Sequence, residues 1–328
     1  MKRLLLFILF FCAAFTLSAG HYGEGADIEP PASAMVSDGD TLYMTFCGKK
    51  KMVVKISLTD PRTPTLLTTY QTGFFPQGLT LHQKKLYVTD GKFLSILHTE
   101  GSTHPHSLLM RFLIGNGPAT GPVDVIFAGE KLLLAARNGG VNHFHADARK
   151  GAGILSGWAR SLTAVENGFI TVFHDSLLMP DGKRIMIPYG TPRKVRRLPD
   201  GRLCLANGFA GIAVIGTDGK TDFTENLNRF SCYGAHVYDI APGRADANGR
   251  TQFVFLAAGE IGVVTAEISS GIRLVTACEA LKWKNINGIL RSRENLVYAA
   301  DETFGLHVLE IQPDGKTLKL VNSLKLTD

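Results

Sequence analysis

A hairpin pattern recurs along this chain of 328 residues and constrains its fold more than any other feature of the sequence. Residues 295–311 combine alternating apolar residues, a polar turn ending in glycine and a second apolar run, so they predict two antiparallel strands joined by a tight turn. A compressed copy of the pattern lies near Phe169. Full copies begin at Leu42, Leu86, Leu132, Leu203 and Val254. The seven copies are spaced roughly 34 to 51 residues apart, which is typical of propeller blades and not of helical solenoids.

The repeats predict an all-β fold: a seven-bladed β-propeller of four-stranded antiparallel sheets, formed as one domain by residues 32–328. The 35 glycines and 14 prolines suit a chain with many tight turns. Residues 162–187 are the weakest copy, and a six-bladed ring in which they merge with their neighbours is the alternative. Residues 21–31 form a polar lead-in. Residues 318–326 are expected to supply an outer strand or to help close the ring with the N-terminal segment, since an open ring leaves strand edges unpaired.

The first 20 residues have the features of a signal peptide. Lys2 and Arg3 precede an apolar run at residues 4–17, and small residues follow, with cleavage expected just before Gly20 or His21. The run is shorter than the roughly 18 residues that a spanning helix needs, and no later stretch is long and apolar enough. We therefore expect a periplasmic or secreted protein without a transmembrane segment.

The cysteines are scattered and form no CxxC pair, which argues against a structural zinc site. Cys12 lies within the apolar run behind Phe11, where lipoprotein processing needs a small residue, so a lipid anchor is not expected. Because an exported chain can keep disulfides, the remaining cysteines could form one or two bridges, or they could be buried free thiols. They are Cys47, Cys204, Cys232 and Cys278.

The formal net charge of +6 includes two residues of the signal peptide, so the mature chain is only mildly basic. Basic clusters at residues 49–51 and 193–197 could meet anionic lipid or polysaccharide, but solvated strand faces are the favoured explanation. The clusters lack aromatic residues at a stacking spacing. Nucleic acid is therefore not an expected partner.

Residues 52–91 resemble a known repeat. The stretch MVVKISLTDPRTPTLLTTYQTG, followed by PQGLTLHQKKLYVTDG, resembles the LVIVD-repeat family of bacterial exported β-propellers. The unit of that family has an apolar strand, a Ser/Thr-Asp-Pro-x-x-Pro turn and a strand ending in Tyr-Val-x-Asp. In the later copies the proline-rich turn is replaced by sequences such as TDGK, SSG and QPDGK. The resemblance implies a propeller and an exported location, and it implies no catalytic residues.

Polar residues at one end of the predicted ring are the candidates for ligand binding. In a propeller the innermost strand of each blade starts at one face, and the loop between the second and third strands opens on the same face. On the inner strands the candidates are Gln77, Asp124, Lys194, His236, Asp239 and Asn287. In the second-to-third loops they are Asp90, Arg137, Asn138, Asn207, Glu260 and Asp301.

Three of these residues, Asp124, Asp239 and Asn287, could supply oxygen ligands to a calcium ion. That arrangement is similar to the lactonase and gluconolactonase type of propeller, although the glutamate ligand of those enzymes has no counterpart at the matching place. Channel-lining residues that hold ordered water are the favoured interpretation.

His143, His145 and Asp147 alternate along a predicted strand and share one face of it. With one further ligand they could bind zinc or copper. A solvated strand face explains the same residues without a metal.

No nucleophile elbow, zinc-protease motif, phosphate-binding loop or Rossmann fingerprint occurs in the sequence. The favoured hypothesis is a monomeric, non-enzymatic exported scaffold that needs no cofactor. It would bind a protein partner or a cell-envelope or extracellular ligand through its channel face. The alternative is a calcium-assisted hydrolase or lactonase with its site at the mouth of the central channel.

Overall fold

The structure is a computed structural model, and it describes residues 33–48, 50–91, 93–99, 108–113, 121–145, 150–225, 236–292 and 294–326. The chain divides into two compact units, Met1–Pro30 and Pro31–Asp328, and all described residues belong to the second. The signal peptide and the lead-in lie outside the described residues and stay predictions. No helix in the described part of the chain has the length and hydrophobicity that a membrane crossing requires.

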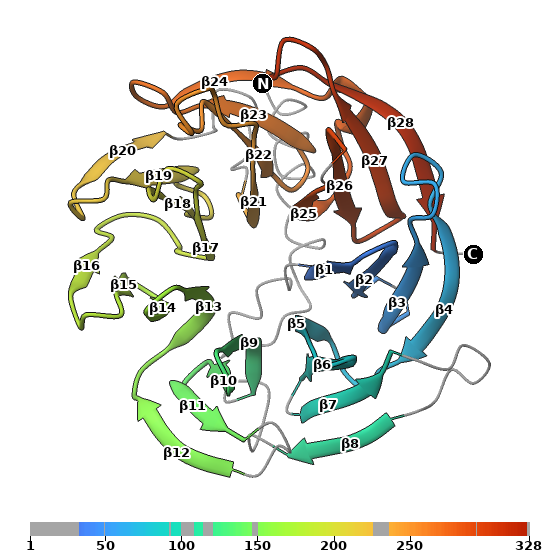
Figure 1. Ribbon diagram of the computed structural model, residues 1–328, viewed down its shortest axis with the longest axis vertical. Coiled ribbons are helices and arrows are strands. Elements are labelled where there is room, and N and C mark those ends of the chain that lie inside the picture. The colour runs from blue at the N-terminus through green and yellow to red at the C-terminus, as the bar shows by residue number, and fades with distance from the viewer. Residues whose placement is uncertain are drawn as a thin grey trace, which may run out of the picture. The chain divides into compact units, whose positions relative to one another are not determined.

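Seven four-stranded antiparallel sheets are present in the described residues, and each is formed by four consecutive strands that pair in sequence order. Figure 1 shows these sheets as the blades of a ring, with the first strand of each blade nearest the axis. The predicted seven-bladed β-propeller is confirmed, and the six-bladed alternative is wrong.

The blades follow one another along the chain. Blade one contains β1 (Met35–Asp38), β2 (Thr41–Phe46), β3 (Met52–Ser57) and β4 (Thr65–Gln71). Blade two contains β5 (Pro76–His82), β6 (Lys85–Asp90), β7 (Phe93–His98) and β8 (Leu108–Leu113). Blade three contains β9 (Pro122–Ala128), β10 (Lys131–Ala136), β11 (Val141–Phe144) and β12 (Lys150–Leu155). Blade four contains β13 (Ala159–Val165), β14 (Gly168–Phe173), β15 (Ser176–Leu178) and β16 (Arg184–Met186).

The last three blades have the same order. Blade five contains β17 (Lys194–Arg197), β18 (Leu203–Ala206), β19 (Ile212–Ile215) and β20 (Thr221–Glu225). Blade six contains β21 (Asp239–Pro242), β22 (Phe253–Ala257), β23 (Val263–Glu267) and β24 (Arg273–Ala277). A short 3-10 helix, η2 (Glu279–Leu281), leads to blade seven, which contains β25 (Ile286–Arg291), β26 (Leu296–Asp301), β27 (Gly305–Ile311) and β28 (Leu318–Lys325).

Asp-Gly-Lys sequences form tight turns between the third and fourth strands of three blades. In each, the carboxylate of Asp181, Asp218 or Asp314 accepts a hydrogen bond from the backbone N–H of the lysine two residues later, at 2.9, 2.9 and 3.0 Å. The glycine between them has φ of +85°, +77° and +71°, a conformation that costs glycine little. The turn chemistry of the sequence therefore sets the ends of these hairpins.

The hydrophobic core lies between neighbouring blades. The middle strands are packed on both faces, so β2 and β26 are buried along almost their whole length and do not alternate with polar residues. One cluster joins Cys204 and Val214 of blade five to Val254 and Leu256 of blade six. Each blade is therefore stabilised mainly by its neighbours.

The ring closes by side-chain packing between blades one and seven, because β1–β4 and β25–β28 form two separate sheets. Leu42 and Met44 share one buried cluster with Tyr298 and Leu306. The Tyr298 hydroxyl donates to the carbonyl of Pro61 at 3.2 Å. Residues 318–325 form β28, so the expected outer strand of the last blade is confirmed.

The predicted start of the weakest copy at residue 162 is three residues late, because β13, the first strand of blade four, begins at Ala159. The polar pair Arg160 and Ser161 interrupts the apolar pattern of this strand and conceals where it starts. Of the cysteines, Cys232 lies outside the described residues. The other three are buried free thiols, which confirms that interpretation for Cys47, Cys204 and Cys278.

Candidate functional site

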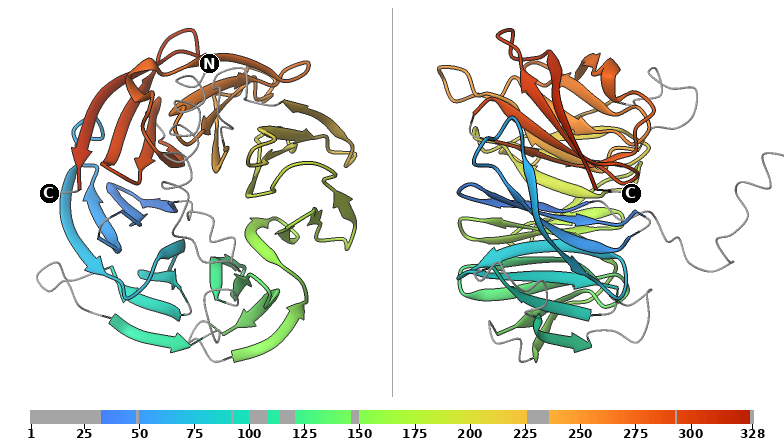
Figure 2. Two further views of the ribbon diagram at one scale, coloured as in Figure 1. Left: turned by 180° about the vertical axis from the view of Figure 1, so that it is seen from behind. Right: turned by 90° about the vertical axis from the view of Figure 1, so that its right-hand side faces the viewer.

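The end of the ring at which each inner strand begins is called the channel face. It is formed by the loops between the second and third strands and by the connections from one blade to the next. The side view in Figure 2 shows that turns and connections form both ends of the ring of strands. The described residues of the channel face are 47–48, 50–51, 72–75, 91, 121, 137–140, 156–158, 174–175, 187–193, 207–211, 236–238, 258–262, 278–285 and 302–304.

All twelve predicted binding residues lie at or beside this face, but their exposure differs. The buried residues are Asp90, Asp124, Asn207, Asp239, Asn287 and Asp301. The partly exposed ones are Gln77, Arg137, Lys194 and His236, and the exposed ones are Asn138 and Glu260. A role of these residues in ligand binding stays a prediction, because the buried ones already take part in contacts within the protein.

Two of the buried aspartates join neighbouring blades. The carboxylate of Asp239 accepts hydrogen bonds from Nε and Nη2 of Arg196, at 3.1 and 2.9 Å. The carboxylate of Asp124 accepts hydrogen bonds from the Ser161 hydroxyl and the Leu162 N–H, at 2.7 and 2.9 Å. Because both carboxylates serve a boundary between blades, their first role is structural.

Two other buried residues hold the connections between blades. The carboxylate of Asp90 accepts hydrogen bonds from the backbone N–H groups of Phe74 and Gly73, at 2.8 and 3.2 Å. The amide of Asn207 donates to the carbonyl of Tyr189 at 2.8 Å. In both places a buried polar residue fixes the backbone beside an aromatic residue that points to solvent.

Trp283, in the connection between blades six and seven, is held by a backbone contact. Its backbone N–H donates to the backbone carbonyl of Glu260 at 2.8 Å. Its φ of +66° is in the left-handed region, where a bulky residue is a genuine outlier. Such strain persists only where the surroundings enforce it, and it concentrates at functional sites.

The exposed large hydrophobic residues of the described chain fall into two groups. The aliphatic ones lie on the outer strands β4, β12 and β16, and they are Leu66, Leu67, Ile154 and Met186. The aromatic ones all lie on connections of the channel face, and they are Phe74, Phe75, Tyr189 and Trp283, which are 39%, 40%, 60% and 74% exposed. We call these four residues the aromatic belt. None of the four was among the candidates predicted from the sequence.

Cationic side chains accompany the aromatic residues of this face. The ammonium of Lys51 lies 3.9 Å from the ring centre of Phe75, and that of Lys284 lies 5.6 Å from the ring centre of Phe304. Arg160 approaches Trp158 to 5.7 Å. These cation–π contacts hold the rings and place positive charge beside them.

A row of aromatic contacts crosses blades four to six. Tyr189 meets Phe209 edge to face at a centroid distance of 5.3 Å, and Phe209 meets His236 at 6.2 Å. His236 meets Tyr238 at 6.2 Å. Tyr189 therefore stands on a supported aromatic base, which lowers the side-chain entropy that a binding partner would have to freeze.

The pKa values of two neighbouring acidic residues at the end of β26 are shifted in opposite directions. Burial acts to raise the pKa of Asp301, but hydrogen bonds from His307 and Thr303 outweigh it, so the pKa lies below its usual range. His307 lies 3.2 Å from Asp301 through Nε2 and 2.8 Å from the Ser323 hydroxyl through Nδ1, so this buried network joins three strands of blade seven. Burial raises the pKa of Glu302, which a hydrogen bond from Asn285 opposes.

The described residues contain no group of three His, Cys, Asp or Glu side chains arranged to hold a metal ion. His143 lies on β11, whereas His145 follows the end of that strand, and their ring centres are 5.1 Å apart. Asp147 lies outside the described residues. The zinc or copper site, like the calcium site, therefore stays a prediction without support from the described geometry.

Comparison with known proteins agrees with the architecture. No family model matches the chain, and no curated protein matches it. Among solved structures, the WD40 repeats of RRP9 match with a TM-score of 0.63 and 12% identity, over 85% of this chain and 88% of that one. A putative 6-phosphogluconolactonase from Bacteroides uniformis matches with a TM-score of 0.63 and 13% identity, over 86% and 95%. YCF48 bound to a D1 peptide matches with a TM-score of 0.57 and 13% identity, over 85% and 92%.

The likeness is one of fold. At these identities the neighbours support a β-propeller and do not transfer an activity, because one scaffold carries many functions.

Proposed function

We propose that this chain is an exported β-propeller scaffold that binds a protein partner on its channel face. The observation that carries the proposal is the aromatic belt: in the described chain every exposed large aromatic residue lies on this one face. Aromatic and arginine side chains are enriched in the cores of protein interfaces and among the residues that contribute most of the binding energy.

The way the belt is held supports the proposal. Buried Asp90 and Asn207 use their hydrogen bonds to fix the connections that carry Phe74 and Tyr189. Trp283 keeps a strained backbone and an exposed ring. A protein under selection for stability alone would replace these residues with polar ones, so a partner that covers them gives the simplest explanation.

The export part of the proposal rests on the sequence of residues 1–20, with its basic start, apolar run and small residues. Membership of the LVIVD-repeat propellers is proposed from residues 52–91 alone. Among the structural neighbours, YCF48 is a propeller seen with a bound peptide, which supports the general use of this fold for protein recognition.

Position-specific photo-crosslinking in cells that produce the chain natively tests the proposal. A photoreactive phenylalanine analogue at Tyr189 or Phe75 should give a discrete adduct with a second protein. The same analogue at Leu67 of β4, which is similarly exposed but lies on an outer strand, is the matched control. Adducts at Leu67 with none at the two belt positions would contradict a channel-face partner, and adducts only with glycan would point to an envelope ligand instead.

A further inference from the structure

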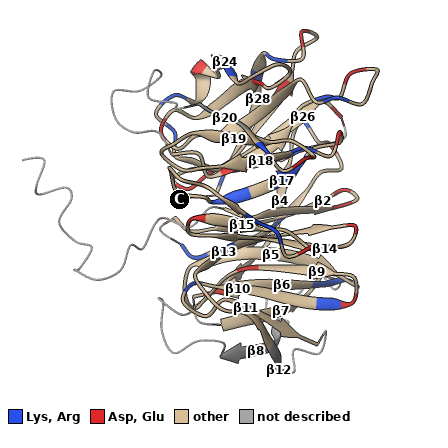
Figure 3. Cartoon of the chain, turned by 90° about the vertical axis from the view of Figure 1, so that its left-hand side faces the viewer, with Lys and Arg blue, Asp and Glu red and all other residues tan. Residues whose placement is uncertain are grey.

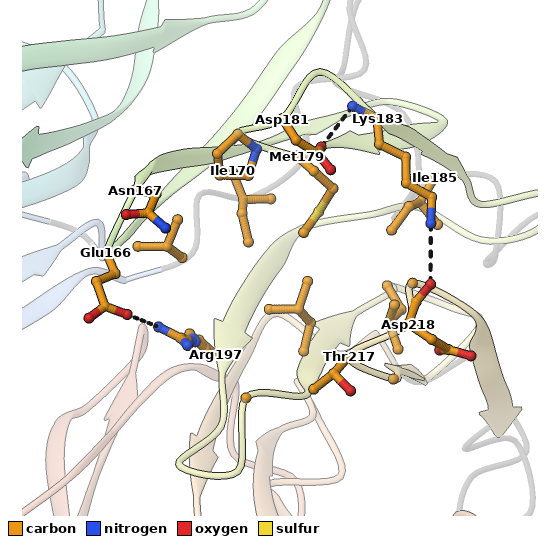
Figure 4. Close-up of a pocket in the computed structure, with 17 residues that line it drawn as sticks. Glu166, Asn167, Ile170, Met179, Asp181, Lys183, Ile185, Arg197, Thr217 and Asp218 are labelled. Carbon is orange, nitrogen blue, oxygen red and sulfur yellow. Dashed lines mark hydrogen bonds and ion pairs between the residues drawn. The ribbon is translucent and has the colours of Figure 1, made fainter.

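A pocket of about 660 Å³ lies between blades four and five, at the end of the ring opposite the channel face. Its lining comes from the β13–β14 and β15–β16 turns of blade four and from the β17–β18 and β19–β20 turns of blade five. Figure 4 shows the pocket as a trough with blade four on one side and blade five on the other. Its size is in the range of pockets that take small molecules.

The floor of the trough is apolar. Ile170 and Ile185 of blade four and Leu203 and Ile215 of blade five belong to the buried cluster between the two blades. Met179, which is partly buried, adds a flexible side chain that adapts to different shapes. The strands β15 and β16 have only three residues each, and they stop before the turns that line the trough. The apolar cluster between blades four and five is therefore open at this end.

A polar contact bridges the two blades at each end of the trough (Figure 4). At one end Glu166 and Arg197 lie 4.0 Å apart, with side chains 82% and 48% exposed. At the other end the ammonium of Lys183 donates to the carbonyl of Asp218 at 3.3 Å. An exposed pair at 4.0 Å contributes little energy, so a ligand can replace it at small cost.

The other acidic groups at the rim are used within their own turns. The carboxylate of Asp181 accepts the N–H of Lys183 at 2.9 Å. The carboxylate of Asp218 accepts the N–H of Lys220 at 2.9 Å and lies 3.6 Å from the Lys220 ammonium. Figure 3 shows that many of the charged residues lie at turns at the ends of the strands.

The cationic side chains at the two ends of the trough, Lys183 and Arg197, have no close carboxylate partner among the described residues. Lys183 forms no ion pair with a described residue, since its ammonium contacts only a backbone carbonyl. Among the described residues, Arg197 pairs only with the distant carboxylate of Glu166. The trough therefore combines an apolar floor with a loosely held guanidinium, whose planar fork is suited to binding a carboxylate through two hydrogen bonds.

We propose that the trough between blades four and five is a binding site for a small aliphatic carboxylate. Its hydrocarbon chain would lie on the floor formed by Ile170, Met179 and Leu203. Its carboxylate would bind the guanidinium of Arg197 and displace Glu166. This site is independent of the channel face and does not depend on a protein partner there.

Isothermal titration of the purified chain with octanoate tests the site directly. Octanol and octyltrimethylammonium have the same hydrocarbon tail with a neutral or a cationic head, so they separate recognition of the carboxylate from general hydrophobic binding. We expect saturable one-to-one binding of octanoate and at least fivefold weaker binding of the other two probes. Equal binding of all three, a preference for the ammonium, or no binding at millimolar octanoate would overturn the proposal.

Three exposed positions give variants that should fold normally. Arg197→Gln should weaken octanoate binding about tenfold, because a charge-assisted hydrogen-bonded contact is lost. Glu166→Gln should strengthen it, because a competing carboxylate is removed. Lys131→Gln, which changes an exposed lysine of blade three that does not line the trough, should leave the affinity unchanged. Equal effects of Arg197→Gln and Lys131→Gln would show that only net charge matters and would exclude a defined site.

Discussion

The guanidinium of Arg196 and the carboxylate of Asp239 form a two-point ion pair across the boundary between blades five and six, at 3.1 and 2.9 Å. Asp239 is buried, whereas the side chain of Arg196 is 31% exposed. Lys194 adds a second cation at 3.9 Å from the same carboxylate. The residue that the sequence offered as a calcium ligand therefore already has protein partners.

Asp239→Asn should lower the free energy of unfolding by about 2–3 kcal/mol, because it breaks a largely buried pair and leaves cations unmatched. Urea unfolding followed by circular dichroism measures the loss. Asp218→Asn, at an exposed turn, is the control and should lower the free energy of unfolding by less.

Added calcium should not raise the melting temperature of the unmodified chain. A calcium-dependent rise that disappears in Asp239→Asn would instead support the hydrolase alternative.

Gly78 of β5 packs directly against the backbone of Asp124 on the neighbouring inner strand. A Cβ at this position would lie 2.5 Å from the Asp124 Cα and 2.9 Å from the Val125 nitrogen, and backbone atoms cannot move aside as a side chain can. Gly78→Ala should therefore destabilise the chain by about 1–3 kcal/mol. Gly153→Ala on β12, whose added carbon would make an ordinary 3.8 Å contact, should stay within about 0.5 kcal/mol. Equal stability of the two variants would show that the inner strands are not crowded.

Glu302→Gln should make the chain more stable at pH 7. Burial raises the pKa of Glu302 in the folded state, so the folded chain holds this proton more tightly than the unfolded chain does. The contribution of protonated Glu302 to stability is fully present when the pH is below the pKa of glutamate in the unfolded chain, which is about 4.3. It is lost as the pH rises through the pKa of Glu302 in the folded chain. Glutamine mimics the protonated form and can still accept from Asn285.

The difference between Glu302→Gln and the unmodified chain should therefore be largest at pH 7 and shrink towards pH 4. Urea titrations at both pH values measure it. Asp301→Asn should instead make the chain less stable at pH 7. Hydrogen bonds from His307 and Thr303 lower the pKa of Asp301, so its carboxylate stabilises the fold above about pH 4. A Glu302→Gln variant that is less stable at pH 7 would show that the charged form is the preferred one.

The fold could be predicted because its signals are local. Strand alternation and turn glycines lie within a few residues of one another, and seven copies of the same pattern leave few architectures open. The start of blade four was placed too late where Arg160 and Ser161 break the apolar pattern of β13. The burial of β26 on both faces was not predicted, although its sequence is apolar at nearly every position.

The candidate site was harder to predict, for a physical reason. Topology gives the end of the ring at which a polar side chain lies, but not whether that side chain faces the channel or a neighbouring loop. Asp90 and Asn207 lie at the expected end of the ring, yet their side chains hold the connections that carry Phe74 and Tyr189. Aromatic residues inside Gly- and Pro-flanked connections, as in TGFFP and PYGTP, are the signal that would have found Phe74, Phe75 and Tyr189, whereas Trp283 in LKWKN has no such flank.

Trp283→Gly should separate stability from function. Trp283 has φ of +66°, a conformation that costs a non-glycine residue about 1–2 kcal/mol, and its ring is mostly exposed. Glycine removes that strain, although its greater freedom in the unfolded chain offsets part of the gain, so the variant should be as stable as the unmodified chain or more so.

Trp283→Gly should also lose the crosslinks expected at Tyr189 and Phe75, because a belt residue is gone. Gln83→Gly, with φ of +47° in the turn between β5 and β6 at the other end of the ring, is the matched control: it should relieve similar strain and keep the crosslinks. Loss of stability in Trp283→Gly with the crosslinks intact would mean that the tryptophan serves the fold and not a partner.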